Sequence, residues 1–395
     1  MIIAILGRQP EISHAELSSL YEDTILIDNQ FTLINKENDF DIQRVGGAHK
    51  AGRVIKSFPA RDDKRAFDFL AKDYFKSQLL PLEPGKITLG ISSYNGPGYI
   101  TTKKLLAIGL HIKKQAKTSG RSLRLVPNKD LVLNSATSHH NKLGLSESKR
   151  ELLVIFTTRS IYIAESLGAQ NITALSERDQ KRPARDAFVG MLPPKLALMM
   201  VNIAAGQAER QGVKPSTILD PFCGTGVVLQ ESWIRGFSVI GTDLSDKMID
   251  YSGRNLDWLQ EKYPRDNLNS TLEQGDAMTH TWPLDKSTPS TAVVCETYLG
   301  QPFSAPPRDA KLEEVRTLCN SIVSSFLKNI HQQLPQGSTL CVAVPAWTTQ
   351  QGDLSRLPVI KTLRKLGYEN LNNKDLIYKR EDQVVARDIL VLRRN

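Results

Sequence analysis

The sequence predicts an α/β protein in which a doubly wound sheet with an antiparallel edge hairpin follows two smaller α+β domains. Three observations predict this fold class. From residue 216 onward, short apolar runs alternate with amphipathic stretches of helical period. The last two runs, 375–378 and 388–392, lie too close together for a crossover helix, so they should pair antiparallel at the sheet edge. Before residue 168, shorter strand and helix patterns alternate.

The expected domains are residues 1–80, 81–168 and 191–395, joined by a charged linker at 169–190. The first begins with a strand and an amphipathic helix, a pattern typical of ferredoxin-like domains. Its predicted elements are strands at 1–6, 24–27, 31–34 and 53–55 and helices at 10–21 and 64–80. For the second they are strands at 86–92, 123–126, 152–157 and 160–164 and helices at 99–117 and 132–143.

The third domain is predicted from the alternation that gives the fold class. A proline pair at 193–194 pre-sets the start of its first helix. Its further predicted elements are strands at 218–222, 237–242, 271–274, 292–295 and 340–344 and helices at 227–234, 246–262, 310–333 and 355–366.

The positive charge of the chain is concentrated in one segment. The net charge is +9, and residues 101–150 hold 11 Lys and Arg against two acids, while the rest of the chain balances at 40 against 40. A localised basic surface is typical of nucleic-acid binding, although a solvated lysine-rich helix face without a partner would give the same pattern. The candidate contacts are Lys103, Lys104, Lys113, Lys114, Arg121 and Arg124.

Three linker arginines, Arg178, Arg182 and Arg185, are further candidates for binding phosphate. Solvated linker charge is the alternative for them.

The compartment is predicted from cysteines and hydropathy. The four cysteines are widely spaced and form no CxxC pair, which favours reduced thiols and gives no metal site. No apolar run approaches the ~18 residues of a membrane span, and residues 1–7 lack the basic start of a signal peptide. We therefore expect a cytoplasmic protein without a membrane partner.

Residues 216–245 carry the most informative pattern. An apolar strand is followed by a glycine turn, a helix, a second strand and Asp243. Gly224 and Gly226 let the backbone approach a ligand closely, and the helix after them begins with unpaired N–H groups. A carboxylate about 20 residues further on is placed to accept from two ribose hydroxyls. The segment therefore predicts a nucleotide-like ligand at the carboxyl edge of a parallel sheet.

These residues, taken together with other segments, resemble a known family. The chain is similar to the THUMP-containing RNA methyltransferases that methylate the exocyclic N2 amine of guanosine in tRNA. The resemblance lies in residues 5–17 and 44–47 (ferredoxin-like domain), 133–136 and 140–143 (THUMP domain), 178–187 and 190–197 (approach to the catalytic domain) and 220–226 (cofactor loop). It implies that the third domain is a Rossmann-like methyltransferase domain and that the second is an RNA-binding THUMP domain.

The resemblance also implies roles for individual residues. S-adenosylmethionine would be the cofactor, with its methionine end in the glycine loop, its ribose on Asp243 and its adenine amine on Asp276. The cofactor-binding residues carried over are Asp220, Phe222, Cys223, Gly224, Thr225, Gly226, Asp243, Leu244, Asp276 and Ala277. A plain strand-end turn is the alternative for Asp276.

The chain departs from the family at the catalytic motif. The family has an acidic or amide residue, two prolines and an aromatic residue at the end of the fourth strand. Here the matching stretch after Cys295 begins with Glu296 and lacks both prolines. Glu296 would accept from the target amine, and Tyr298 or, as an alternative, Phe303 would stack on the base, so that catalysis would depend on orientation more than on proton transfer.

Three functions remain open from the sequence. The first is methyl transfer to guanine N2 in tRNA. The second is a DNA methyltransferase acting on adenine N6 or cytosine N4, since such enzymes share the cofactor loop. The third is a catalytically inactive RNA-binding protein of the same fold. The sequence also leaves open whether a small activating subunit is needed.

Overall fold

The computed structural model describes residues 1–35, 39–186, 191–381 and 383–395. The chain forms two compact units: Met1–Pro10 with Tyr21–Ala174, and Glu11–Leu20 with Leu175–Asn395. Residues 187–190, part of the predicted linker and of the segments that carry the resemblance, lie outside the described residues. Within the described ranges, no helix has the length and hydropathy needed to cross a membrane.

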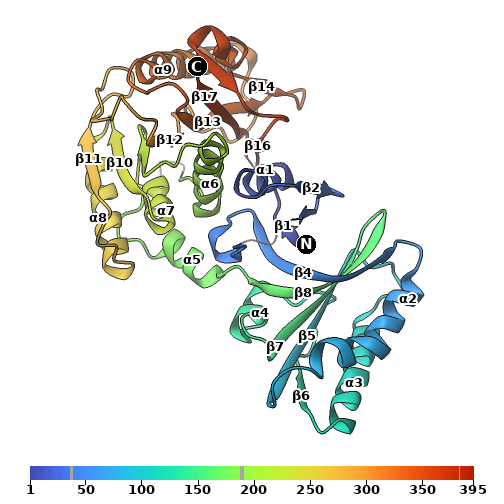
Figure 1. Ribbon diagram of the computed structural model, residues 1–395. Helices are drawn as coiled ribbons and strands as arrows, with labels where there is room; N and C mark the ends of the chain where they lie inside the picture. The colour runs from blue at the N-terminus through green and yellow to red at the C-terminus, as the bar shows by residue number, and fades with distance from the viewer. Residues whose placement is uncertain (36–38, 187–190, 382) are drawn as a thin grey trace. The chain divides into compact units, whose positions relative to one another are not determined.

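The first unit is built on one eight-stranded sheet with the order β2-β3-β1-β4-β8-β7-β5-β6. Its strands are β1 (Ile2–Leu6), β2 (Thr24–Ile27), β3 (Phe31–Ile34), β4 (Ala48–Pro59), β5 (Lys86–Tyr94), β6 (Ser122–Leu125), β7 (Lys149–Phe156) and β8 (Ser160–Ala169). The long strand β4 pairs with β1 on one side and with β8 on the other (Figure 1). The strands predicted for the first two domains therefore share a continuous sheet.

Helical segments cover one face of the β5–β8 half of this sheet. They are α2 (Asp63–Asp68), two π-helical turns (Phe69–Asp73 and Phe75–Leu79) and α3 (Thr102–Thr118). All pack on β5, β7 and β8 through one apolar cluster (Figure 1). The Thr101 hydroxyl caps α3 by accepting from the Lys104 N–H, and Leu105, Ile108 and Ile112 face the cluster. A short helix, α4 (Ser135–His140), follows β6.

A buried ion pair joins the two halves of this sheet. Lys50 on β4 is 0% exposed, and its Nζ donates to the Leu133 carbonyl at 2.6 Å and to the Glu151 carboxylate on β7. The Ser92 hydroxyl on β5 donates to the same Glu151 oxygen at 2.6 Å. Burial lowers the pKa of Lys50, and the neighbouring Glu151 opposes that shift. Each charge therefore compensates the cost of burying the other, and removing one of them would leave an unpaired buried charge.

We expect Lys50→Met to cost about 3–5 kcal/mol of unfolding free energy, because it leaves Glu151 buried without a counter-charge. Denaturant unfolding monitored by circular dichroism would measure the loss. Lys72→Met is the control, since Lys72 pairs with Asp68 on an exposed surface, where such pairs contribute ~0–1 kcal/mol. The double variant Lys50→Met/Glu151→Leu should recover most of the stability. Equal losses of stability in Lys50→Met and Lys72→Met would contradict a special role for the buried pair of Lys50 and Glu151.

The second unit is built on a nine-stranded sheet with the order β11-β10-β9-β12-β13-β17-β15, to which β14 and β16 are attached. The strands are β9 (Thr217–Asp220), β10 (Ser238–Asp243), β11 (Ser270–Gln274), β12 (Thr291–Glu296), β13 (Thr339–Thr348), β14 (Leu354–Arg356), β15 (Tyr368–Asn370), β16 (Ile377–Tyr378) and β17 (Val385–Arg394). From β11 to β13 all neighbours are parallel, whereas β17 runs antiparallel to β13. The predicted antiparallel pairing of the last two strands is confirmed by β16 and β17, and the short strands β15 and β16 lie on the outer side of β17.

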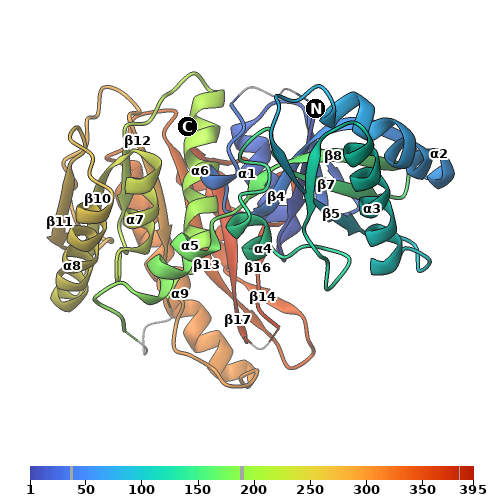
Figure 2. The ribbon, with the colours of Figure 1, turned by 90° about the horizontal axis from the view of Figure 1, so that it is seen from below.

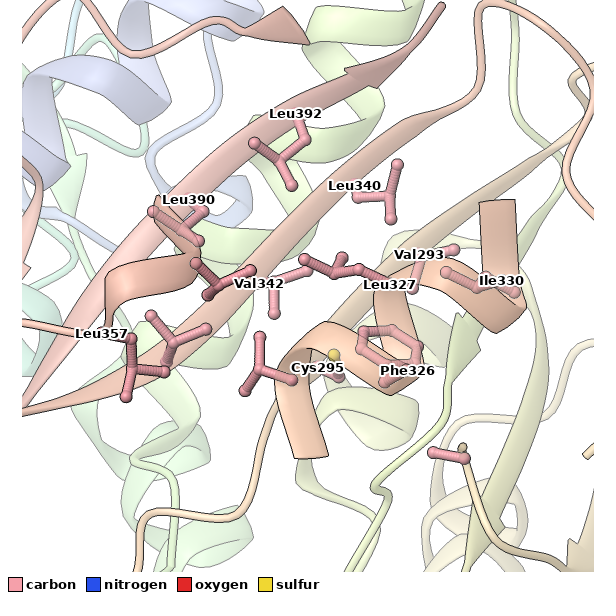
Figure 3. Close-up of a cluster of buried hydrophobic side chains, with 14 of the residues drawn as sticks. Val293, Cys295, Phe326, Leu327, Ile330, Leu340, Val342, Leu357, Leu390 and Leu392 are labelled. Atoms are coloured by element: carbon pink, nitrogen blue, oxygen red, sulfur yellow. The ribbon is translucent and has the colours of Figure 1, made fainter. Parts of the chain in front are cut away.

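Alternating residues of the central strand β12 explain why helices cover both faces. Ala292 and Val294 pack in the cluster that contains α6 (Pro194–Arg210), while Val293 and Cys295 pack in the cluster that contains α9 (Asp309–His331). Figure 3 shows Val293 and Cys295 beside Phe326 and Leu327 of α9. The helices α7 (Val227–Arg235) and α8 (Asp246–Lys262) lie beside β10 on the α6 side (Figure 2). The doubly wound arrangement predicted from the sequence is confirmed.

One helix from the N-terminal region packs in this second unit. α1 (Pro10–Leu20) buries Ile12 in the α6 cluster, and the Glu16 carboxylate accepts from Asn202 Nδ2 at 2.6 Å. A Cβ at Gly206 would lie 2.6 Å from the Ser19 carbonyl oxygen, so glycine permits this close approach. The periodicity predicted the helix, but its partner lies almost two hundred positions further along the chain.

Candidate active site

Four carboxylates lie at the carboxyl edge of the second sheet. Asp220, Asp243 and Glu296 end the strands β9, β10 and β12, and Asp276 follows β11. Because these strands are parallel neighbours, their ends meet at the same edge, where open α/β sheets bind ligands. Asp220 is 2% exposed, and burial raises its pKa well above the usual value, with the charges of Asp243 and Glu296 adding to the shift.

The glycine loop between β9 and α7 has the conformation that its sequence predicts. Gly224 and Gly226 have φ angles of +52° and +78°, in the left-handed region that favours glycine. The Asp243 carboxylate accepts from the Gly224 N–H at 3.0 Å and from the Ser245 N–H at 2.9 Å. A Cβ added at Gly224 would meet no atom within 4 Å, so the loop presents open space at that position.

Helix α8 holds the loop from behind through two residues that the sequence analysis missed. The Ser252 hydroxyl donates to the Gly224 carbonyl at 2.8 Å. Asn255 is 0% exposed and donates through Nδ2 to the carbonyls of Thr225 and Ala184, each at 2.9 Å. Its Oδ1 accepts from the Ala184 N–H at 2.9 Å. The only sequence signal was two polar residues on the otherwise apolar face of an amphipathic helix.

The remaining predicted cofactor residues surround these groups. One carboxylate oxygen of Asp276 accepts from the Met278 N–H at 2.9 Å. Leu244 is 70% exposed, whereas Ala277 is buried. The Phe222 ring packs edge-on against Phe326 of α9, with ring centroids 5.1 Å apart. Cys223 is buried, and burial raises its pKa well above the usual value, so its thiol stays protonated and unreactive.

Glu296 lies at the carboxyl end of β12 and pairs with an arginine from the far end of the chain. Arg387 on β17 donates through Nε to Glu296 Oε1, and the two side chains are only 7% and 13% exposed. Burial raises the pKa of Glu296, while the charge and hydrogen bond of Arg387 lower it. Tyr298, two residues further on, is 46% exposed. A paired carboxylate therefore ends β12, and an exposed tyrosine follows it two positions later in the chain.

The basic residues predicted on the first unit have different surroundings. Lys103, Lys113, Lys114 and Arg124 are exposed. Lys104 lies 4.1 Å from the centroid of the Phe67 ring, and Arg121 donates to the carbonyls of Leu82 and Glu83 at 2.6 and 2.9 Å. A groove of about 390 Å³ is lined by Leu110, Lys113, Lys114, Lys117, Arg121, Ser122 and Leu123.

The linker arginines are not equally available at the surface. Arg182 is 3% exposed and donates to Met191 Sδ at 2.8 Å, so its guanidinium cannot contact RNA in this conformation. Arg178 is also buried and donates twice to Glu231, at 2.6 and 3.0 Å. Arg185 is exposed. Burial of the first two could not be predicted from a charged, non-periodic stretch.

Comparisons with curated proteins agree with the resemblance predicted from the motifs and confirm it as a similarity of sequence. The tRNA (guanine(10)-N2)-dimethyltransferase of Methanothermobacter thermautotrophicus is 31% identical over 169 residues, which cover 42% of this chain and 43% of that protein. The protein of the same name from Pyrococcus abyssi is 24% identical over 261 residues, 65% of this chain and 67% of that protein. The chain thus spans less than half of the length of the first relative. No family model matches it.

Among solved structures, the crystal structure of TrmN from Thermus thermophilus is similar in fold. The two share 14% sequence identity with a TM-score of 0.50, over 100% of this chain and 99% of that chain. At this identity the likeness shows the fold alone.

Proposed function

We propose that this chain is an S-adenosylmethionine-dependent RNA methyltransferase whose target is the N2 amine of guanine in tRNA. The observation that carries the proposal is the glycine loop braced by Asp243, with Glu296 ending the strand on the other side of β9. The two curated relatives are named as tRNA guanine-N2 dimethyltransferases, which supports the same substrate here.

The residues at the carboxyl edge fit the cofactor. The open space at Gly224 would receive its methionine end. Each oxygen of Asp243 accepts one backbone N–H, and a carboxylate oxygen has a second lone pair, so both can still accept from a ribose hydroxyl. Asp276 would accept from the adenine amine, and exposed Leu244 would cover the adenine ring. Bound S-adenosylmethionine supplies a methyl group on a sulfonium centre.

Glu296 would orient the target base. Guanine places its N2 amine next to an N1–H, so its edge offers neighbouring donors, and an ionised carboxylate accepts from both. Adenine and cytosine place a ring nitrogen with a lone pair beside their amine, which would repel the second carboxylate oxygen. The carboxylate thus favours guanine over the bases of the DNA rival, and Tyr298 would stack on the ring. Correct orientation of the weakly nucleophilic amine is the main catalytic contribution.

Mass spectrometry of nucleosides would test the function directly. Unmodified tRNA is incubated with the purified protein and S-adenosylmethionine, then digested. We expect N2-methylated guanosine as the product. Methyl transfer only to duplex DNA would favour the amino-methyltransferase of DNA. A failure to bind S-adenosylmethionine at millimolar concentration would favour the inactive RNA-binding protein.

The basic groove on the first unit would contact the RNA backbone. We expect Lys113→Ala/Lys114→Ala to weaken binding of a labelled tRNA transcript about tenfold and to reduce the slope of log affinity against log salt by about 2. Filter binding across a salt series would measure both quantities. The matched control is Lys361→Ala/Lys365→Ala, an exposed pair of lysines in the second unit. Equal losses from the two pairs would contradict a specific role for the groove.

A further inference from the structure

The ion pair between Glu296 and Arg387 follows from the sheet register. Glu296 lies opposite Ala343 on β13, which in turn lies opposite Ile389 on β17. Arg387 precedes Ile389 by two positions, so its side chain leaves the sheet on the same face as Glu296. On that face the guanidinium spans the width of β13 to reach the carboxylate.

Several charged groups surround this pair. Asp220 at the end of β9 interacts electrostatically with Glu296 and with Asp243 of β10. The Arg387 guanidinium lies 5.8 Å from the centroid of the Tyr378 ring on β16. Lys195 lies in the first turn of α6. The carbonyl of Ala204, later in α6, accepts from the Thr339 hydroxyl at the start of β13, so the first turn of α6 lies toward the carboxyl edge of the sheet. Arg387 is the cation that contacts Glu296 directly.

The pair explains how a carboxylate can stay ionised at a buried position. Burial disfavours the charged form of Glu296, and the guanidinium of Arg387 opposes that effect. A protonated Glu296 would carry an O–H donor, which cannot accept from both guanine N–H groups. The segment after Glu296 also lacks the two prolines that would stiffen it. A fixed guanidinium is therefore needed both to keep the charge and to orient the side chain.

We infer that Arg387 is a positioning residue for the methyl transfer: it holds Glu296 ionised and directed at the target amine. This role rests on the proposed function, and it adds to the site a residue 91 positions from the carboxylate it controls. Arg387 itself need not touch cofactor or base.

The test compares Arg387→Met and Arg387→Lys with the wild type. Loss of a cation beside a carboxyl group changes its pKa by ~1–3 units, so the acid limb of kcat/KM for tRNA methylation should move to higher pH by at least about one unit in Arg387→Met. Arg387→Lys should restore part of the shift. Calorimetry should show that the variants bind S-adenosylmethionine within about twofold of the wild type, because a positioning residue affects the methyl transfer and not the binding of the cofactor.

The control is Arg393→Met. Arg393 lies on the same strand, β17, and pairs with the exposed Glu369. Its pH profile should match the wild type. A carboxyl ¹³C NMR titration, with the Glu296 signal identified by its loss in Glu296→Gln, would follow the pKa without relying on activity. An unshifted Glu296 titration in both Arg387 variants would overturn the inference even if methylation is observed. If the wild type methylates neither tRNA nor DNA, the proposed function fails, and the catalytic role of Arg387 fails with it.

Discussion

Replacing Glu296 with glutamine is expected to lower kcat for tRNA methylation by about 10²-fold, the size of effect that misplacing a reacting group by ~1 Å produces. The glutamine amide would present an N–H₂ donor to the guanine N1–H, so the base could not adopt the orientation that the carboxylate gives it. Binding of S-adenosylmethionine should persist, because Glu296 lies on the side of β9 away from Asp243.

The pH dependence sharpens this prediction. Glu296 must be ionised to accept from two donors, so activity should fall as pH falls through its pKa. Burial raises that pKa above the usual value of 4.5, and the acid limb of kcat/KM should therefore lie above pH 4.5. In Glu296→Gln no carboxyl titrates at this position, so the remaining activity should lack the limb.

A stability measurement must accompany the kinetics. Glu296→Gln leaves Arg387 buried without a counter-charge, and breaking a buried pair typically costs about 3–5 kcal/mol. Denaturant unfolding would show whether the variant is folded under assay conditions. Glu314→Gln on α9, where Glu314 forms an exposed pair with Lys311, is the matched control. Undiminished methylation by folded Glu296→Gln would remove the catalytic assignment and leave the fold intact.

How far the sequence predicts this site depends on how local each interaction is. Gly224, Gly226 and Asp243 belong to one strand–turn–helix–strand segment, and their geometry follows from it. Asn255 and Ser252 act on the same loop from the next helix, so they emerge only when the packing face of α8 is known. The closer two residues lie within one supersecondary unit, the more of their interaction the sequence predicts.

Arg387 illustrates the opposite case. Its contact with Glu296 requires that β17 lie next to β13, with the short strands β15 and β16 outside it. Strand order of this kind is decided by tertiary packing, which periodicity does not encode. The same reason explains α1: the sequence predicts both α1 and α6, but not that α1 packs on α6. The burial of Arg182 likewise depends on a contact with Met191, nine positions further along the chain.

We expect Asp243→Ala to weaken S-adenosylmethionine binding by about 10²–10³-fold. Two losses combine: the hydrogen bonds from the Gly224 and Ser245 N–H groups that shape the loop, and the proposed bonds to the ribose hydroxyls. Hydrogen bonds to a charged group contribute ~1.5–3 kcal/mol each, so loss of one or two of them accounts for this range. Isothermal titration calorimetry would measure the affinity.

The matched control for this variant is Asp250→Ala on α8, an exposed carboxylate that lies 3.7 Å from Arg254. It removes the same charge from the same region without touching the loop, so its affinity for S-adenosylmethionine should stay within about twofold of the wild type, the scale of a screened surface charge. If both variants bind equally well, Asp243 does not contribute to cofactor binding and its proposed role is wrong. If Asp243→Ala alone loses affinity, the carboxylate that braces the glycine loop is required for cofactor binding, as the proposed site demands.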